Sequence, residues 1–240
     1  MNYVAFSGGA DSTALAILLH ERGEEFELVF CDTGAELPET YETITRVAKA
    51  LRRKLRVLSG GSFYQWLVHY GWMLPAPFCR WCTRVLKQVP QERFFKADDV
   101  VAIGIRADEA HRGLSEHKYA VRRPLVDAGM TKRDVLELCR KYDLLNPAYA
   151  WRTNVSCFCC PFQRKSDWRG LLRVHPYLYA LAEQWEQRCM DWADEHREDG
   201  VHPRFTWNEA FTLRQLREAD ESQLRLFPEP EEEACSICRW

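Results

Sequence analysis

Six residues near the start of the chain combine conformational freedom with groups that bind anions. They lie between an apolar run and an aliphatic run, and they are Ser7, Gly8, Gly9, Ala10, Asp11 and Ser12. Consecutive glycines adopt backbone angles that are closed to other residues. The backbone N–H groups of such a turn, with the helix N-terminus behind them, attract phosphate. The string predicts a phosphate-binding turn in which Ser7 and Ser12 add hydroxyl donors. Asp11 would cap the helix or reach a metal ion on the phosphates.

The spacing separates this turn from two common phosphate-binding loops. No lysine follows the glycines, so the turn is not a Walker A loop, and its spacing differs from the dinucleotide fingerprint G-x-G-x-x-G. A plain strand-to-helix turn would account for a lone Gly-Gly pair. The whole string directly after a first strand favours phosphate binding instead.

Four cysteines form two pairs with the spacing of metal ligands. Two residues separate Cys79 from Cys82, and two separate Cys157 from Cys160. Four thiolates are a ligand set for zinc or for a 4Fe–4S cluster, and here the fold must bring two distant loops together. Four buried structural thiols are the alternative interpretation. Cys159, next to the second pair, is a candidate free thiol.

The elements that must position these groups alternate between two patterns. Short apolar runs predict strands, and aliphatic or amphipathic stretches predict helices, in the order strand 3–6, helix 13–20, strand 26–31, helix 39–51, strand 55–58 and strand 100–105. This alternation predicts the α/β class, with a doubly wound, mostly parallel sheet covered by helices on both faces. A capping box at Thr131 predicts a helix through Tyr142, and residues 156–220 are mainly helical in pattern.

Composition narrows the class of protein. The 240 residues carry a net charge of −2 and are 46% hydrophobic, as in ordinary globular proteins rather than general nucleic-acid coats. Arg164, Lys165 and Arg169 form a local basic cluster, for which a solvated helix face is the favoured interpretation. No apolar run matches a membrane span and the N-terminus has no basic leader, so we expect a cytoplasmic protein without membrane contact. In that compartment, ten cysteines favour metal binding or thiol chemistry over disulfides.

The turn, in its context, resembles the PP-loop of N-type ATP pyrophosphatases, the adenine nucleotide alpha hydrolase-like superfamily. Later segments resemble the phosphoadenosine phosphosulfate (PAPS) reductase family, and these are 30–34 with 38–40, 104–106 with Glu109 and Arg112, 124–125, and 146–147 before Tyr149. The resemblance spans residues 3–168. It implies a doubly wound sheet with the nucleotide at the carboxyl ends of the strands.

The resemblance also implies roles for particular residues. The expected nucleotide-binding residues are Ser7, Gly8, Gly9, Asp11, Ser12, Asp32, Gly104, Arg106 and Arg112. Arg106 is expected to act in catalysis as well, because its planar fork binds oxyanions of phosphate or sulfate in pairs. A cap on the following turn is the alternative for Asp32, and a surface charge is the alternative for Arg112.

The cysteine pairs resemble the cluster ligands of sulfonucleotide reductases and the pairs in sulfur-transfer enzymes of DNA phosphorothioation. That resemblance favours a 4Fe–4S cluster on Cys79, Cys82, Cys157 and Cys160, with zinc as the alternative. The position of the adjacent cysteine pair differs from that in the cluster-bearing reductases. The cluster-bearing reductases have an adjacent Cys-Cys in the first region, whereas here the adjacent pair is Cys159-Cys160 in the second.

A C-terminal tail with a catalytic cysteine is a further property of PAPS reductases, and Cys235 is the corresponding candidate here. The usual surrounding pattern, Glu-Cys-Gly-Leu-His, is absent. The neighbouring run 231–233, three glutamates, would raise the thiol pKa and oppose the role. A disordered tail with incidental cysteines, or with Cys235 and Cys238 as metal ligands, is the alternative.

We expect a nucleotide-binding α/β domain at 1–155, a helical region opening with a cysteine loop at 156–226, and a flexible tail at 227–240.

Three functions remain open. A PAPS reductase would bind a sulfonucleotide and use a thiol reductant protein. An ATP-dependent sulfur transferase or adenylating enzyme would use Mg²⁺ and act on a nucleic acid or a small molecule. A non-catalytic nucleotide- and cluster-binding subunit is the third. The order of the segments favours the reductase narrowly, and the sequence gives no oligomeric state.

Overall fold

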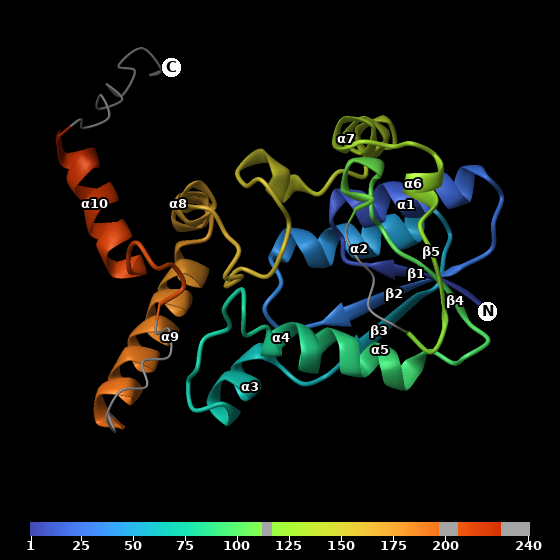
Figure 1. Ribbon diagram of the computed structural model, residues 1–240. Coiled ribbons are helices and arrows are strands. Elements are labelled where there is room, and N and C mark those ends of the chain that lie inside the picture. Colours follow the sequence, from blue (N-terminus) through green and yellow to red (C-terminus); the bar gives the residue numbers. More distant parts are fainter. Residues whose placement is uncertain (112–116, 197–205, 227–240) are drawn as a thin grey trace, which may run out of the picture.

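The structure, a computed structural model, describes residues 1–111, 117–196 and 206–226. A five-stranded sheet with the order β3-β2-β1-β4-β5 runs through it (Figure 1). Every pairing in this sheet is parallel. The strands are β1 Asn2–Phe6, β2 Glu27–Asp32, β3 Leu55–Ser59, β4 Val100–Ala102 and β5 Ala120–Arg122. The sheet confirms the predicted α/β class with parallel strands.

Helices connect the strands and then continue beyond the sheet. They are α1 Ala10–Glu21, α2 Pro38–Ala50, α3 Phe63–His69, α4 Trp81–Thr83, α5 Val89–Phe94, α6 Pro124–Asp127, α7 Lys132–Lys141, α8 Lys165–Val174, α9 Pro176–Glu195 and α10 Leu213–Leu226. The π-helical turn η1, Arg84–Gln88, joins α4 to α5, and η2 (Ala107–Glu109) and η3 (Pro147–Ala150) are 3₁₀ turns. Thr131 and Asp134 form the predicted capping box at the start of α7.

The side chains of β1 alternate between two separate cores, as the pleat of a strand requires. Val4 and Phe6 join a core built with α1, α2 and α7. Tyr3 and Ala5 instead pack on the opposite face, where Phe95 at the end of α5 is fully buried. Figure 1 shows α1, α2 and α7 on one face of the sheet and α5 on the other. Helices therefore cover both faces, which is the doubly wound arrangement that the sequence predicts.

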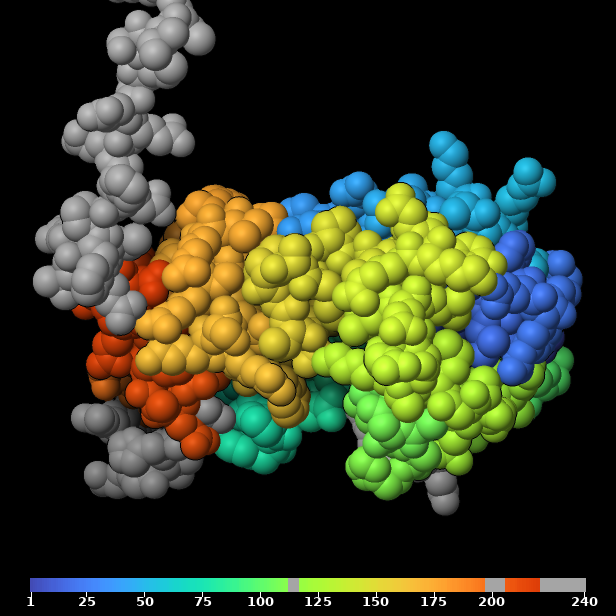
Figure 2. Space-filling view, turned by 90° about the horizontal axis from the view of Figure 1, so that it is seen from above, coloured from blue at the N-terminus to red at the C-terminus, as the bar shows by residue number. Residues whose placement is uncertain are grey.

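A third core lies beyond the carboxyl ends of the strands, where α8 and α9 pack beside α3 (Figure 1). Its centre is aromatic: Trp185 of α9 stacks on Phe63 of α3 with ring centroids 5.5 Å apart and an angle of 8° between the planes. Figure 2 shows the yellow segment around residues 145–160 between orange α8–α9 and yellow-green α7. The strand ends therefore face a second packed unit rather than open solvent.

Two boundaries differ by three residues from the sequence-based expectation, and the other boundaries of these strands and helices differ by one residue at most. Helix α1 begins at Ala10 rather than Thr13, so Asp11 and Ser12 belong to its first turn. Strand β4 ends at Ala102 rather than at residue 105. Gly104 then passes so close to α1 that a Cβ there would lie 3.0 Å from the backbone nitrogen of Ser12. In the part of the chain that the structure describes, no helix is both long and apolar enough to cross a membrane.

Candidate nucleotide and thiol site

The turn between β1 and α1 has the backbone of an anion cradle. Gly8 has a φ of 71°, the left-handed region that favours glycine. Gly9 is the N-cap of α1 with extended φ and ψ angles of −83° and 164°. The first N–H groups of a helix have no partner within the helix and carry partial positive charge. Gly9 rather than Asp11 thus caps the helix, which corrects one of the two roles expected for Asp11.

Side chains on both sides brace this turn. The hydroxyl of Ser12 accepts the N–H of Ser7 at 3.2 Å and donates to the carbonyl of Gly9 at 3.1 Å. From the distant segment that begins η3, Asn146 Nδ2 donates to the Gly8 carbonyl at 3.0 Å. Tyr149 Oη accepts the N–H of Ala10 at 3.1 Å. Ser12 therefore holds the shape of the turn, while Ser7 is exposed at its mouth.

Arg106 meets the turn, but it does so through carboxylates. Its Nη1 lies 2.7 Å from Oδ2 of Asp11, and its other nitrogens pair with Asp108 and Glu109. The Arg106 side chain is only 10% exposed. Burial raises the pKa of Asp11, and Arg106 opposes that shift. The structure thus brings Asp11, Gly104 and Arg106 together at the start of α1.

Asp32 lies at the end of β2 and binds its own turn. Its Oδ1 accepts the N–H of Gly34 at 2.9 Å and the hydroxyl of Tyr41 at 2.8 Å. This is the geometry of a turn cap, the alternative that the sequence leaves open. Arg112 and the tail cysteines Cys235 and Cys238 lie outside the described residues.

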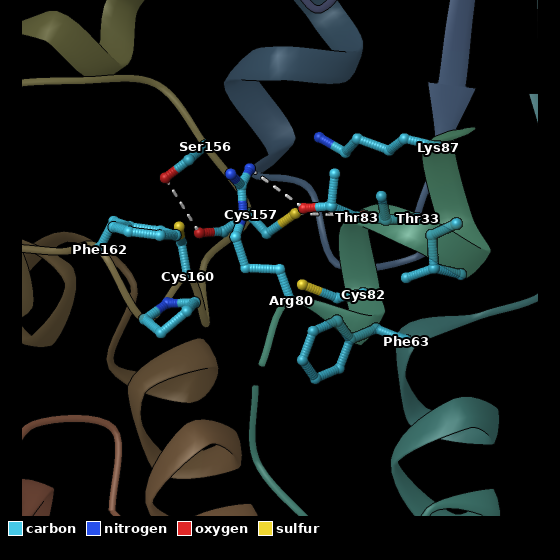
Figure 3. A pocket seen from close by; sticks show the side chains of 12 residues that line it. Thr33, Phe63, Arg80, Cys82, Thr83, Lys87, Ser156, Cys157, Cys160 and Phe162 are labelled. Atoms are coloured by element: carbon cyan, nitrogen blue, oxygen red, sulfur yellow. Dashed lines mark hydrogen bonds between the residues drawn. The ribbon is translucent and has the colours of Figure 1, made fainter. Parts of the chain in front are cut away.

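One cysteine of the first pair and both cysteines of the second pair meet at one cavity. Cys82 of α4 lines a cavity of about 190 Å³ together with Cys157 and Cys160, which lie 75 or more positions later in the chain. Figure 3 shows these three side chains converging from opposite sides. Cys79 is not among the lining residues, and Cys159 is fully buried in the aromatic core. We call the space lined by Cys82, Cys157 and Cys160 the thiol cavity.

Cys157 has two polar neighbours from the loop after β2. Its Sγ lies 3.3 Å from Oγ1 of Thr33 and 3.4 Å from Oε1 of Glu36. Glu36 is buried and also accepts the Thr33 hydroxyl at 2.9 Å. Burial raises the pKa of the Cys157 thiol, and the charge of Glu36 raises it further, whereas Lys87 lowers it. Its surroundings therefore disfavour the thiolate form of unliganded Cys157.

Cations surround the thiol cavity. Lys87 of η1 and Arg80 line it directly. Burial opposes the charge of Lys87, but electrostatic interactions with Cys157 and Glu36 outweigh the effect of burial and raise the pKa of Lys87. Arg152, 4% exposed, lies behind the cysteine loop and donates to Gln163 Oε1 at 2.9 Å. These groups favour an anionic occupant or thiolate ligands in the cavity.

Lys87 and Glu36 link the thiol cavity to the strand ends. A smaller cavity of about 110 Å³ lies at the carboxyl ends of β1 and β2, where Ser7, Cys31 and Glu36 line it together with Lys87. Lys87 therefore borders both cavities, and Glu36 borders one while contacting Cys157 of the other. Sequence reasoning missed both residues. Lys87 follows Cys82 by five positions in a helical stretch, where a lysine is ordinarily solvent-exposed.

The arrangement of thiols bears on which metal group could be held. Within residues 1–111, 117–196 and 206–226, no three His, Cys, Asp or Glu side chains are grouped closely enough to hold one metal ion. A tetrahedral zinc ion would bring its thiolates to about 3.8 Å from one another, given Zn–S bonds of about 2.3 Å. In a 4Fe–4S cluster each thiolate binds a different iron, so the sulfurs stand farther apart. Three of the four predicted cysteine ligands line one cavity in this arrangement.

The fold and the turn correspond to a known family. The model of the phosphoadenosine phosphosulfate reductase domain matches residues 1–154. That match covers more than half of the chain, and the chain therefore belongs to this family. Membership confirms the resemblance that the motifs from Ser7 to Tyr149 carry.

Relatives with curated sequences are longer than this chain. An uncharacterized protein of Methanocaldococcus jannaschii is 29% identical over 207 residues, which are 80% of this chain and 42% of that protein. A second uncharacterized protein of the same organism is 34% identical over 92 residues, 38% of this chain and 22% of that protein. The chain thus spans less than half the length of these relatives.

Solved structures with a similar fold include a PAPS reductase. The phosphoadenylyl-sulfate (PAPS) reductase of Candida auris, in its phosphate complex, has a TM-score of 0.52 and 16% identity over 65% of this chain and 80% of that one. A U34-tRNA thiolase of Methanococcus maripaludis, with its 4Fe–4S cluster, has a TM-score of 0.44 and 16% identity over 91% of this chain and 80% of that one. The first likeness supports the fold, and a TM-score as low as the second does not establish one.

Proposed function

We propose that this chain is an enzyme that binds an adenine nucleotide or sulfonucleotide at the turn Ser7–Ser12 and carries out sulfur chemistry at the thiol cavity. The favoured reaction is reduction of phosphoadenylyl sulfate, the activity for which the family is described. One observation carries the proposal. Lys87 borders both the cavity at the strand ends, beside Ser7, and the cavity of three thiols.

In this reaction the turn Ser7–Ser12 binds the phosphates, and cysteines carry out the chemistry on sulfur. The glycine turn and the first N–H groups of α1 bind the phosphates, and Lys87 offsets negative charge between nucleotide and thiols. A cysteine thiolate attacks the sulfur of the sulfonucleotide, so that an S–S bond forms and the bond from sulfur to the phosphate oxygen breaks. Adenosine 3′,5′-bisphosphate leaves. A second thiol then attacks the cysteine sulfur, sulfite leaves with the electron pair, and a disulfide remains for a thiol reductant protein to reduce.

Two assignments in this scheme are predictions from the family resemblance. Cys235 is the predicted attacking thiol, and it lies outside the described residues. Cys82, Cys157 and Cys160, with Cys79 as fourth ligand, are the predicted holders of a 4Fe–4S cluster. When bound, such a group would supply a redox-active centre next to the nucleotide.

ATP-dependent sulfur transfer is the second candidate. It is favoured by the position of the thiols, because three of them stand in the folded body of the protein, so the described sulfur site does not require the tail. In that reaction the turn holds the pyrophosphate of ATP with Mg²⁺. Asp11, in the first turn of α1, is the carboxylate that we expect to bind this metal ion. The acceptor would be a nucleic acid or a small molecule.

An anaerobic assay separates the two reactions. The purified protein receives either PAPS with a thiol reductant or ATP with Mg²⁺, and sulfite and pyrophosphate are both measured. Sulfite release that Cys235→Ala abolishes supports reduction, whereas pyrophosphate release without sulfite supports sulfur transfer. Lys87→Met should abolish either product, with Lys165→Met, an exposed lysine of α8, as the matched control. Failure to bind either nucleotide would contradict the proposal.

A further inference from the structure

A second pocket lies beside the thiol cavity and has a different lining. Its volume is about 520 Å³, within the range of about 300–1,000 Å³ that small-molecule sites occupy. No residue of the phosphate turn lines it. Most of its walls come from the segment around α3 and from α9, and the turn after β2 and the cysteine loop each add one residue. Its lining residues are Gly34, Ser62, Tyr64, Trp72, Phe158, Leu181, Gln184, Trp185 and Arg188. We call this space the aromatic pocket.

One face of α9 forms a complete wall of the pocket. Leu181, Gln184, Trp185 and Arg188 are spaced i, i+3, i+4 and i+7, so their side chains leave the helix on the same side. Trp185 is buried at the base of this wall, while Gln184 and Arg188 are exposed at its edge. The wall thus offers an aromatic surface with an amide and a guanidinium at its rim.

The opposite wall is aromatic as well. The Tyr64 ring centroid lies 5.9 Å from that of Trp72 and 6.0 Å from that of Trp185, and Tyr64 is 49% exposed. Trp72 has a φ of 62°, which costs about 1–2 kcal/mol for a residue with a side chain and therefore requires support from its surroundings. The guanidinium of Arg188 lies 5.5 Å from the Trp72 ring centroid. Trp72 thus closes the pocket against α9.

The lining selects a class of ligand. Aromatic faces stack on flat rings, and the Ser62 hydroxyl, the Gln184 amide and Arg188 can bond the polar edge of a heterocycle or a phosphate beside it. No carboxylate lines the pocket, and Arg188 repels cations, which argues against an aromatic cage for an ammonium group. A planar, neutral or anion-bearing heterocycle fits these features best.

Three segments form the partition between the aromatic pocket and the thiol cavity. Thr33, Phe63 and Cys157 line the thiol cavity, and their sequence neighbours Gly34, Ser62, Tyr64 and Phe158 line the aromatic pocket. One layer of chain therefore separates the two spaces. A ligand in the aromatic pocket would stand next to the sulfur chemistry without occupying the phosphate turn.

We infer that the aromatic pocket binds a nucleobase, presented either by a free nucleoside or nucleotide or by a single-stranded nucleic acid. In ATP-dependent sulfur transfer, the second candidate function, on which this role alone rests, the base belongs to the acceptor of sulfur. Binding itself requires neither the turn nor a cluster. The inference can therefore fail while the proposed nucleotide turn stands, and the reverse also holds.

Fluorescence anisotropy of the full chain tests the inference with fluorescein-labelled single-stranded 12-mers of RNA and DNA. An abasic 12-mer has the same phosphates and no bases, so it measures charge attraction alone. Free nucleosides, which carry no phosphate for the turn, are added as competitors. Competition by nucleosides at similar strength assigns the pocket to a free ligand, and binding of the 12-mers without such competition assigns it to a strand. We expect base-bearing ligands to bind more tightly than the abasic strand.

Variants locate the binding. Stacking energies predict that Tyr64→Ala weakens binding about 5- to 150-fold, whereas Tyr177→Ala, 77% exposed on α9 outside the pocket, leaves it unchanged. Leu181→Trp fills the pocket without removing an aromatic wall and should weaken binding similarly. Equal binding of abasic and base-bearing strands, or binding that both pocket variants leave intact, would overturn the inference. Inorganic pyrophosphate binding, measured separately by calorimetry, reports on the phosphate turn and should survive both variants.

Discussion

The guanidinium of Arg106 holds the carboxylate of Asp11 at 2.7 Å, and this pair joins the segment after β4 to the first turn of α1. Asp108 and Glu109 occupy the remaining nitrogens of Arg106. The pair places a compensated carboxylate at the mouth of the phosphate turn. Without the arginine, three carboxylates would repel both one another and an incoming anion.

Arg106→Met should therefore weaken nucleotide binding at least about tenfold and lower the free energy of unfolding by about 1–3 kcal/mol, because a mostly buried ion pair loses one partner. Calorimetric titration with ATP or PAPS and urea unfolding measure the two effects. Arg133→Met, an exposed arginine of α7, is the control. Unchanged affinity in Arg106→Met would show that Arg106 serves only the fold.

The two glycines of the turn should respond differently to alanine. A Cβ on Gly8 would lie 3.0 Å from Ile44 Cγ2 and would require the left-handed backbone, so Gly8→Ala should cost about 1–2 kcal/mol or more. At Gly9 the nearest atom is 3.5 Å away and φ is −83°, so Gly9→Ala should change the free energy of unfolding little. Denaturant unfolding compares the variants. Equal destabilisation by the two substitutions would contradict this backbone geometry.

Substitutions of the adjacent residues Cys159 and Cys160 should distinguish a metal ligand from a residue of the hydrophobic core. Cys160→Ser removes a thiol that lines the thiol cavity and should lower bound iron and visible absorbance. Cys159→Ser places a hydroxyl in the aromatic core, where Cys159 is 0% exposed, and should cost about 1–3 kcal/mol of unfolding free energy while iron is retained. Elemental analysis of anaerobically purified protein distinguishes the two. Stoichiometric zinc in a colourless protein would reject the cluster.

A buried glutamate predicts how stability depends on pH. Glu186 of α9 is 1% exposed and accepts the N–H groups of Trp207 and Leu213. Burial raises its pKa to about 7, against 4.5 for an unperturbed glutamate, although the two backbone donors lower it. The folded state therefore binds more protons than the unfolded state between these values.

Stability from Glu186 is fully present below about pH 4.5 and is lost as the pH rises through about 7. The contribution is at most about 3.5 kcal/mol, since one pKa unit corresponds to about 1.4 kcal/mol. Urea unfolding at several pH values should show this decline in the native protein and a flatter profile in Glu186→Gln. A steeper profile in the variant would reverse the assigned direction.

Local features of the chain determined the class of fold and the position of the turn. Apolar runs such as 26–31 predicted buried parallel strands because strand pattern and burial are read within a few residues. The glycines of Ser7–Ser12 predicted the turn for a similar reason, because only glycine adopts the backbone of Gly8 without strain. The capping box at Thr131 was equally local, and the structure contains it.

Only the tertiary structure decided which distant groups meet. It gave Arg106 three carboxylate partners, set Cys79 outside the thiol cavity, and placed Lys87 between that cavity and the strand ends. It also built the aromatic pocket from α3 and α9, which lie more than a hundred residues apart. Residue type and spacing fix local geometry, but contacts across such separations depend on how all the helices pack, and that information is spread over the whole chain.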